Sequence, residues 1–577
     1  MDLTWTLIVF AVVMILIWRF LGSYLAAVYE GRVRYLSFIE GPIYRLVGVD
    51  PEVEQSWQRY SMSLIVYSSV AILVVYGMLR LQGSLPLNPQ HLGAVGPALS
   101  WNTAVSFLTN TNWQNYSGES TMSYLSQMGA LAVQNFVSAS VGVAVAIALV
   151  RGFARRGSVT IGNFWVDLIR GVLYVLLPIA LVAAVIFISQ GAIQTLGGPV
   201  TIHDTLNHVT RTRVFTQTIP RGPFASQEAI KELGTNGGGT YNGNGATPFE
   251  NPTAFTNFLS IVLLLAIPFA LTYTFGKMVG NFRQGVAVVA AMVILFGAWV
   301  AMGEIAEHGT NPAVARAGLT YQPGGNVEGK EVRFGVSDSI FYNIASTQTS
   351  TGSVDSANDS LTPIGGFAVL TGMMLGEISP GGTGSGLYTI LLFAIITVFI
   401  GGLMVGRTPE FLGKKIQSKE VKLAALGVLI MPIVVLIFTG IAVAVHAGRI
   451  GPTINYGPHA FTEILYAFTS TAANNGSAFA GLNIPVNPTT QWWYNVALGW
   501  SMLAGRFLML IPVLALAGNL ASKKSVPPSP GTFPVNTALF AALLVSVILI
   551  LSALTFFPAL SLGPILEHLL LKTGQLF

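Results

Sequence analysis

Four short polar motifs in this sequence have residue types that could replace the water shell of a monovalent cation. They are rich in Gly, Asn, Thr and Ser and recur roughly every 115–125 residues, at Thr109–Gln114, Gly234–Gly239, Thr349–Ser353 and Ala472–Ser477. Backbone carbonyls of turns can coordinate a dehydrated cation, and glycine permits the backbone angles that such turns need. We interpret the four motifs as the quarters of one cation filter.

Each motif follows a stretch that predicts a short helix, too short to cross a membrane. These stretches are 100–108, 226–233, 337–347 and 459–468, with Ser100, Ser226 and Ser337 as expected N-caps and Pro458 in the first turn. Non-helical backbone persists at membrane depth only inside protein or beside water. A helix that ends at the motif would also direct negative partial charge toward a cation. Any one motif could be an ordinary outer loop, because Gly and Asn are common in turns, but four in register disfavour that reading.

The composition requires these motifs to lie in a membrane protein. Of 577 residues, 52% are hydrophobic and only 9% are charged, too few to cover a soluble surface of this size. About 20 apolar residues are needed for each span. The sequence predicts ten spans, near 4–28, 61–82, 129–150, 164–189, 253–276, 284–305, 361–404, 421–446, 491–519 and 536–558. The seventh is interrupted by the glycine-rich stretch Ser379–Gly386 and predicts a broken helix.

Basic residues predict the orientation of these spans. Lys and Arg concentrate in alternate connections, at 29–60, 151–170, 277–283, 405–422 and 523–524, which the positive-inside rule assigns to the cytoplasm. The polar segments 83–128, 190–252, 306–360 and 447–490 then face outward, and both termini lie outside. The net charge of +5 is explained by these loops and does not indicate nucleic-acid binding.

The expected fold is an all-α integral membrane protein with about ten transmembrane helices. Four pseudo-repeated units, each a span, a pore helix and a span, surround a central pore, with one extra helix at each end. The expected divisions are 1–58 for the first extra helix and its loop, 59–156, 157–282, 283–420 and 421–525 for the repeats, and 526–577 for the last helix. The third repeat contains the broken helix.

Two charges fall within predicted spans, where charge is expensive and usually faces a cavity or an opposite charge. Glu377 precedes the glycine-rich break, and Arg506 lies in the ninth span. We interpret them as a pair beneath the filter, with Gly381, Gly382 and Gly384 in a gate that blocks direct passage; Arg407 could join them. In the alternative, Arg506 only ties helices together.

These strings resemble a known family. The fourfold repeat resembles the potassium transporter superfamily that includes Trk, Ktr and HKT proteins. The strings Thr109–Gln114, Gly234–Gly239, Pro248–Pro252, Thr349–Ser353, Asp359–Pro363, Gly406–Ile416 and Asn474–Gly481 are similar to KdpA, the potassium-binding subunit family of bacterial Kdp P-type potassium-transporting ATPases. The resemblance covers essentially the whole chain. Thr351 stands where that family often has Cys, and its carbonyl would survive this change.

The resemblance implies a role and a set of ligands. This subunit would select extracellular K⁺ and pass it to a P-type ATPase catalytic subunit, assisted by small accessory Kdp membrane subunits, in the bacterial inner membrane. The implied K⁺ ligands, most of them through backbone carbonyls, are Asn110, Thr111, Asn112 and Gln114; Thr235, Asn236, Gly237 and Gly238; Ser350, Thr351, Gly352 and Ser353; and Asn474, Asn475 and Gly476. K⁺ is the only metal ion implied.

Catalytic motifs are not found in the sequence. It contains neither an Asp-Lys-Thr-Gly phosphorylation string nor a Walker string, so no catalytic residue and no cofactor is expected in this chain, and ATP and Mg²⁺ belong on the partner. The seven histidines are isolated from one another in the sequence and predict no site. The alternative function is a stand-alone Trk/Ktr-like potassium transporter or channel subunit; a membrane-embedded enzyme is disfavoured because acidic metal-binding clusters are not evident.

Overall fold

The computed structural model describes residues 3–203, 216–484, 487–527 and 532–575. Ten helical segments of this described part are long and apolar enough to cross a membrane, which confirms the predicted spans. They are α1 (Leu3–Tyr29), α3 (Trp57–Leu81), α6 (Val133–Ala154) with the π-helical turn before it (Ser126–Ala132), α7 (Phe164–Arg170) continuing through a π-helical turn (Gly171–Leu176) into α8 (Leu177–Ser189), α10 (Ala254–Met278), α11 (Phe282–Glu307), α15 (Ser385–Met404), α16 (Ser418–Ala444), α19 (Pro488–Ser522) and α20 (Ala538–Leu562).

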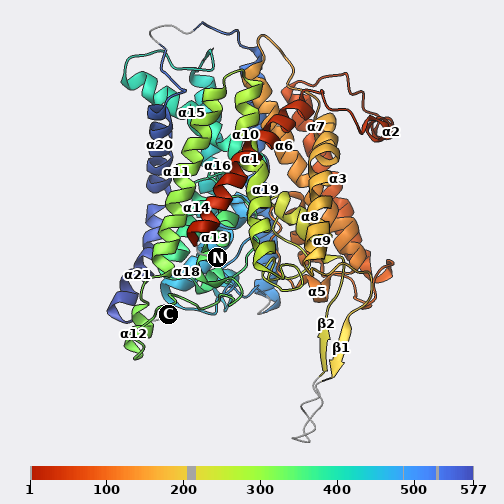
Figure 1. The fold of residues 1–577 in the computed structure, drawn as a ribbon, viewed down its shortest axis with the longest axis vertical. Coiled ribbons are helices and arrows are strands. Elements are labelled where there is room, and N and C mark those ends of the chain that lie inside the picture. Colours follow the sequence, from red (N-terminus) through yellow and green to blue (C-terminus); the bar gives the residue numbers. More distant parts are fainter. Residues whose placement is uncertain (1–2, 204–215, 485–486, 528–531, 576–577) are drawn as a thin grey trace, which may run out of the picture.

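The spans run along the long axis of the molecule, and the connections gather at its two ends (Figure 1). The segments predicted to be cytoplasmic lie at the upper end of Figure 1, where α2 (Ser37–Val47) projects sideways. The segments predicted to face outward lie at the lower end, with α5 (Gly118–Thr121), α12 (Pro312–Arg316) and α21 (Pro564–Thr573). Both chain ends lie in the lower half of this view.

Four short helices stand between the spans, as the sequence predicts. They are α4 (Pro97–Leu108), α9 (Phe224–Leu233), α13 (Gly335–Thr347) and α18 (Gly457–Ala473). Ser100, Ser226 and Ser337 were expected to be N-caps, but each helix begins two or three residues earlier, so this prediction is wrong. Pro458 does occupy the first turn of α18.

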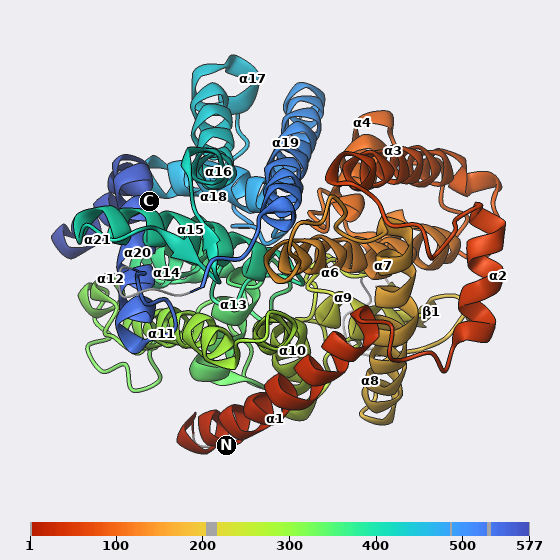
Figure 2. The same cartoon turned by 90° about the horizontal axis from the view of Figure 1, so that it is seen from above.

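Viewed from above, four helix groups follow one another around the centre (Figure 2). In chain order they are α3–α4–α6, α8–α9–α10, α11–α13–α14–α15 and α16–α18–α19. The seventh span is broken as predicted, because α14 (Pro363–Met374) ends ten residues before α15 begins. The extra helices lie outside this ring: α1 packs along α10, where Trp18 Nε1 donates to Thr272 Oγ1 at 2.8 Å, and α20 packs against α11 and α15.

Small elements complete the chain. An antiparallel hairpin of β1 (Val200–His203) and β2 (Thr216–Ile219) projects from the lower end, with Val200 opposite Ile219. A second two-stranded pair joins β3 (Glu410–Phe411) to β4 (Lys414–Lys415). Among the described residues, the remaining elements are the single turns Gln82–Ser84 and Asn358–Ser360 and the short helix α17 (His446–Arg449). The sequence predicted none of these elements.

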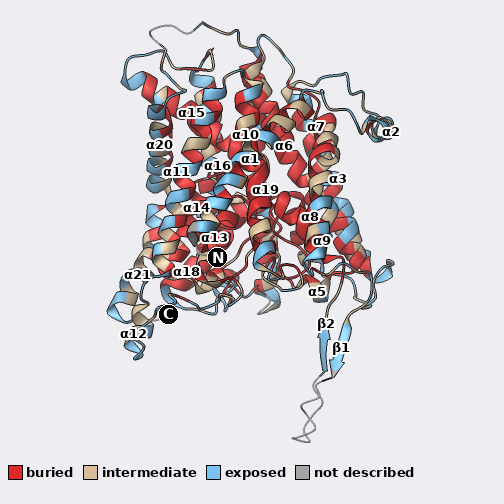
Figure 3. Cartoon of the chain, viewed as in Figure 1, coloured by how far each residue is buried: buried red, intermediate tan, exposed pale blue. Residues whose placement is uncertain are grey.

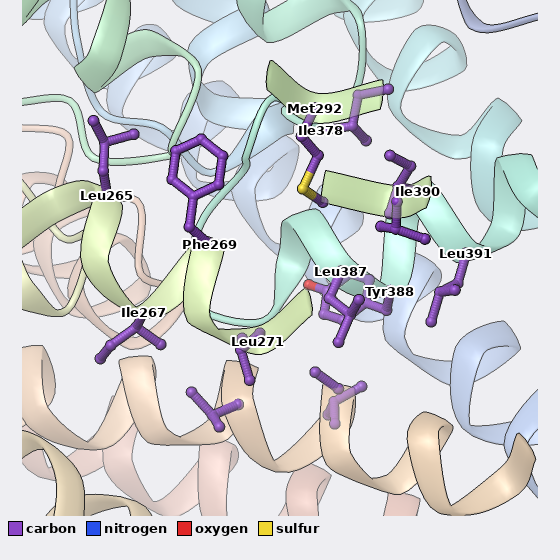
Figure 4. Packing of buried hydrophobic residues seen from close by; sticks show 14 of the residues in the cluster. Leu265, Ile267, Phe269, Leu271, Met292, Ile378, Leu387, Tyr388, Ile390 and Leu391 are labelled. Carbon is purple, nitrogen blue, oxygen red and sulfur yellow. The ribbon is translucent and has the colours of Figure 1, made fainter. Parts of the chain in front are cut away.

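The spans differ in burial (Figure 3). α6, α10 and α15 are mostly buried, whereas α1, α3 and α20 expose apolar side chains along most of their length, as lipid-facing helices do. α10 contacts α15, and Figure 4 shows Leu271 of α10 near Leu387 and Tyr388 of α15. This core fixes the positions of the short helices and of the loops that follow them.

Candidate cation-binding site

The four polar motifs are buried loops that begin where the four short helices end. We name them loop 1 (Asn110–Trp113), loop 2 (Thr235–Gly238), loop 3 (Ser350–Ser353) and loop 4 (Asn474–Ser477). The second residue of each loop donates its backbone N–H to the carbonyl five residues earlier, in the last turns of the helix. The donor–acceptor pairs are Thr111 and Ser106 (3.0 Å), Asn236 and Lys231 (2.7 Å), Thr351 and Ser346 (3.1 Å), and Asn475 and Ser470 (2.8 Å). Polar residues are thus held at the centre of the molecule without regular secondary structure.

The four loops share one backbone pattern. At the first position φ is 68° for Asn110, 49° for Thr235, 54° for Ser350 and 61° for Asn474. At the third position φ is 54° for Asn112, 72° for Gly237, 82° for Gly352 and 103° for Gly476. Positive φ is uncommon outside glycine, and for a β-branched residue such as Thr235 it is an outlier that surrounding structure must enforce. The repetition of the pattern shows that the four motifs are structurally equivalent.

The loops contact one another in a closed ring. At three junctions the third-position glycine of one loop packs so closely against a backbone carbonyl oxygen of the next that an added Cβ would overlap it. The glycine and oxygen pairs are Gly237 with Thr351, Gly352 with Asn475, and Gly476 with Thr111. At the fourth junction Gly238 packs against the Asn112 carbonyl in the same manner. The order around the ring is therefore loops 1, 2, 3 and 4, returning to loop 1.

Side-chain amides reinforce the junction between loops 1 and 2. Asn110 Nδ2 donates to the Thr235 carbonyl at 2.7 Å, and Asn236 Nδ2 donates back to Asn110 Oδ1 at 2.6 Å. Asn112 Nδ2 donates to the Gly238 carbonyl at 3.2 Å. Loop 1 has Asn rather than Gly at its third position, and at this junction several side-chain amide hydrogen bonds add to the close packing of Gly238 on the Asn112 carbonyl.

Gln114 belongs to the same junction. Its Nε2 donates to the Gly239 carbonyl at 2.9 Å, and its Oε1 accepts from the Gly239 N–H at 3.1 Å. Oε1 also accepts from Asn244 Nδ2 at 2.8 Å. Both ends of the Gln114 amide are therefore engaged with the segment that follows loop 2.

Hydroxyl groups hold loops 3 and 4 to their own helices. The Tyr342 hydroxyl donates to Ser353 Oγ at 3.0 Å, and the Tyr466 hydroxyl lies 2.7 Å from Ser477 Oγ. The sequence separation is 11 residues in both pairs, a second sign that the units are equivalent. Ser353 Oγ also donates to Glu232 Oε2 at 2.9 Å, which links loop 3 to α9.

The segment that joins α14 to α15 passes across the ring of loops, on the side where the four short helices end. We call residues 375–384 the crossing loop. Thr383 donates its N–H to Thr235 Oγ1 at 3.0 Å, and Gly382 packs against Ser350. Glu377 Oε1 accepts from Asn475 Nδ2 at 3.1 Å. One segment therefore contacts loops 2, 3 and 4.

Close packing also fixes the glycines of the crossing loop. A Cβ on Gly381 would overlap the Glu377 carbonyl, and one on Gly384 would overlap the carbonyl of Gly142 in α6. Both have φ near 80–100°, at 81° and 99°. Glycine is required at these two positions by backbone angle and by space together.

A cavity of about 380 Å³ lies beside the crossing loop and is lined by Glu377, Tyr388, Asn474 and Arg506, together with apolar side chains of α15, α16, α19 and α20. Both predicted intramembrane charges thus face one cavity. Among the described residues no ion pair joins them; Arg506 Nη2 instead donates to the Ser138 carbonyl at 3.4 Å. Arg407 is not brought to this site: it lies exposed beyond the far end of α15 and donates to the Thr532 carbonyl at 3.3 Å.

A buried charged cluster behind loop 2 was not predicted. Lys231 of α9 is fully buried, and its Nζ lies 2.6 Å from Glu228 Oε2 and 3.5 Å from Glu250 Oε2. Buried charges persist only when they are paired in this way. The sequence did contain a signal for this cluster, because α9 is too short to span and carries three charged residues. Charged residues at membrane depth indicate function or close pairing.

Known proteins resemble this chain along nearly its whole length. Residues 8–569 match the KdpA family, described as the potassium-transporting ATPase A subunit. A protein of Granulibacter bethesdensis named "Potassium-transporting ATPase potassium-binding subunit" is 52% identical over 99% of each chain. One of Solibacter usitatus with the same name is 53% identical over 96% of each chain.

Among solved structures, the potassium transporter TrkH of Vibrio parahaemolyticus aligns with a TM-score of 0.49 and 16% sequence identity, covering 77% of this chain and 84% of that one. Family membership rests on the sequence relationships instead, because they combine high identity with nearly complete coverage. The chain belongs to the KdpA family of potassium-transporting ATPase A subunits.

Proposed function

We propose that this chain selects and binds extracellular K⁺ in the ring of loops 1 to 4 and passes it to a P-type ATPase partner for ATP-driven uptake. The observation that carries this proposal is the closed ring, in which four equivalent uncharged loops meet at the ends of four short helices. The names of the relatives, potassium-binding subunits of a potassium-transporting ATPase, agree with it.

The chemistry of the ring suits K⁺. Backbone carbonyls from four loops that meet in one ring can together surround a dehydrated cation. Carbonyl dipoles replace a hydration shell without binding the ion too tightly to release it. The ligands in this proposal are those that the resemblance implies, mostly through backbone carbonyls in loops 1 to 4 and at Gln114, whose side chain also positions the segment after loop 2.

The cavity and the crossing loop supply a second part of the proposal. An ion leaving the ring toward the helix-end side meets residues 375–384, and we assign this segment, with Gly381, Gly382 and Gly384, as the barrier to direct passage. Glu377 connects the barrier to loop 4, and Arg506 keeps the cavity wall positive. The ion is then diverted sideways into the cavity, toward the partner. Arg407 has no part in this barrier, since it lies elsewhere.

Energy comes from the partner in this proposal. The chain is the non-hydrolytic subunit, ATP and Mg²⁺ bind the catalytic subunit, and small accessory membrane subunits complete the complex. We place the protein in the bacterial inner membrane with both termini outside, because the basic connections gather at the end of the molecule opposite the hairpin of β1 and β2. The repeats then run over 59–156, 157–282, 283–420 and 421–525.

Co-purification combined with rubidium binding tests this proposal. The tagged chain, expressed with its neighbouring subunits, is expected to retain a P-type ATPase whose vanadate-sensitive activity rises with K⁺. Radioactive Rb⁺ bound to the complex should be displaced by K⁺ and not by an equal concentration of Na⁺. Saturable Rb⁺ binding and uptake without an ATPase partner would support the stand-alone transporter instead, and equal displacement by Na⁺ would contradict selection at the ring.

A further inference from the structure

A cluster of metal-ligating side chains lies apart from the ring, at the beginning of α18. His459 is in the first turn of this helix, and Glu463 is one turn further along. Asp359 reaches the cluster from the turn Asn358–Ser360, and Glu567 reaches it from α21. Three segments far apart in the sequence therefore converge here, and two of them, α18 and α21, lie in the lower part of Figure 1.

We propose that Asp359, His459 and Glu463 form a binding site for a divalent transition-metal ion, with Zn²⁺ the best match. His459 Nε2 lies 3.2 Å from Asp359 Oδ1 and 3.9 Å from Glu463 Oε1. One ligand atom from each of the three residues lies within 4.8 Å of the others. Ligands that bind zinc at about 2.0–2.2 Å with tetrahedral angles lie roughly 3.3 Å apart, so only a small contraction is needed. One imidazole and two carboxylates suit zinc better than Mg²⁺ or Ca²⁺, which prefer oxygen alone.

The other face of the imidazole has the partner that metal-binding histidines use. His459 Nδ1 lies 2.9 Å from Glu567 Oε1. A carboxylate that accepts the Nδ1 proton leaves the Nε2 lone pair directed toward a metal and fixes the orientation of the ring. Glu567 is therefore a positioning residue for His459 and ties α21 to α18.

An independent observation comes from Glu463. Its side chain is fully buried, and its Oε2 has no hydrogen-bond partner. Oε1 accepts from Asn455 Nδ2 at 2.7 Å, which leaves most of the carboxylate's acceptor capacity unused. An unpaired buried carboxylate oxygen is expensive, and a metal ion would satisfy it.

The charge balance of the cluster points the same way. Three carboxylates surround one imidazole, and within the described residues no ion pair joins any of the three to a lysine or arginine. Gly481, which follows loop 4, packs so closely on Glu463 that an added Cβ would overlap Oε1. A metal here would fasten the segment after loop 3 and α21 to the helix that carries loop 4.

A proton is the competing occupant. Burial acts to lower the pKa of His459, but hydrogen bonds and charges of Asp359 and Glu567 outweigh burial and raise the pKa to about 10. A protonated His459 would bind both carboxylates and leave Glu463 Oε2 unpaired. Metal binding must displace this proton, so the two occupants give opposite results in a metal titration.

The test uses the complete complex, stripped with a chelator and titrated with Zn²⁺ alone. We expect one zinc ion per chain, with affinity at least 100-fold weaker in His459→Gln and Glu463→Gln and about 10–100-fold weaker in Glu567→Gln. His308→Gln is the matched control, because His308 also lies near a carboxylate, 3.2 Å from Glu304, outside the cluster. It should bind zinc as the wild type does.

Co²⁺ provides a second measurement that does not depend on a variant folding. Wild-type complex loaded with Co²⁺ should show visible absorption bands, which added Zn²⁺ abolishes. The proposal is overturned if stripped wild type binds no more zinc than His459→Gln, if His308→Gln loses zinc equally, or if Co²⁺ gives no visible bands. A protonated His459 is the conclusion in the first of these cases. None of these results bears on K⁺ binding, which is measured separately with Rb⁺.

Discussion

The junction between loops 1 and 2 is built differently from the other three junctions of the ring. Between loops 2 and 3, 3 and 4, and 4 and 1, a glycine at positive φ packs directly on a backbone carbonyl. Between loops 1 and 2, Gly238 packs on the Asn112 carbonyl, and side-chain amides of Asn110, Asn112 and Gln114 add several hydrogen bonds. Both constructions place four equivalent loops in one ring. Backbone packing cannot adjust to an added atom, whereas a network of several amide hydrogen bonds can lose one and keep the rest.

The comparison predicts its largest effect at a glycine junction. Gly237→Ala should weaken apparent K⁺ affinity about 30- to 5000-fold, because the left-handed backbone costs about 1–2 kcal/mol and overpacking about 1–3 kcal/mol more. Gly280→Ala is the matched control, with φ of 70° against 72° and no atom near its Cβ. Rb⁺ binding measures both; equal losses in the two variants would show that backbone angle alone matters.

A large effect is also expected where the crossing loop meets loop 4. Glu377→Ala removes both the charge and the acceptor for Asn475 Nδ2, whereas Glu377→Gln keeps an acceptor oxygen. A hydrogen bond to a charged group contributes about 1.5–3 kcal/mol, so we expect a roughly tenfold or greater loss of coupled uptake in Glu377→Ala and less in Glu377→Gln. K⁺ transported per ATP hydrolysed in vesicles measures coupling. Normal coupling in both variants would contradict the proposed role of the crossing loop as the barrier to direct passage.

A moderate effect is expected at the amide junction. Gln114→Ala removes two hydrogen bonds to Gly239, each with a net value of about 0.5–1.5 kcal/mol, and should weaken apparent K⁺ affinity about tenfold. Gln90→Ala, which removes one hydrogen bond to the Glu119 carbonyl in the same outer segment, is the control. If Gln114→Ala were as damaging as Gly237→Ala, the two kinds of junction would not differ in tolerance.

The smallest effect is expected at the tyrosine hydroxyls that hold loops 3 and 4 to their own helices. Tyr466→Phe removes the hydroxyl that meets Ser477 Oγ and leaves the ring packing intact. The loss of one such bond, about 1 kcal/mol, should lower affinity less than tenfold, and Tyr342→Phe should behave alike because it contacts Ser353 in the same way. Competition of K⁺ against Rb⁺ resolves a difference of this size. Unequal results would show that loops 3 and 4 are not energetically equivalent.

Local patterns predicted much of the fold. The length of the apolar stretches predicted the ten spans, and the glycine-rich stretch after Glu377 predicted the broken helix. Short helix-like stretches before Thr109, Gly234, Thr349 and Asn474 predicted the four short helices. These features depend on composition within one window, so a single sequence contains them.

Features that depend on distant contacts were not predicted. The order of the loops around the ring, the use of both ends of the Gln114 amide, and the meeting of His459 with Asp359 and Glu567 all join segments far apart in the chain. Arg407 was expected to join Glu377 and Arg506, but α15 is 20 residues long and places it about 30 Å away. The distance between two residues in the sequence does not show how far apart they lie in the folded protein.

The most direct test of the ring is the junction that closes it, between loops 4 and 1. Gly476 has φ of 103° and packs on the Thr111 carbonyl, whereas Gly191 has φ of 106° with no atom near its Cβ. Equilibrium Rb⁺ binding to the purified complex should be lost or weakened at least about 30-fold in Gly476→Ala and unchanged in Gly191→Ala. Wild-type Rb⁺ affinity in a folded Gly476→Ala complex would contradict the claim that these four loops form the cation site.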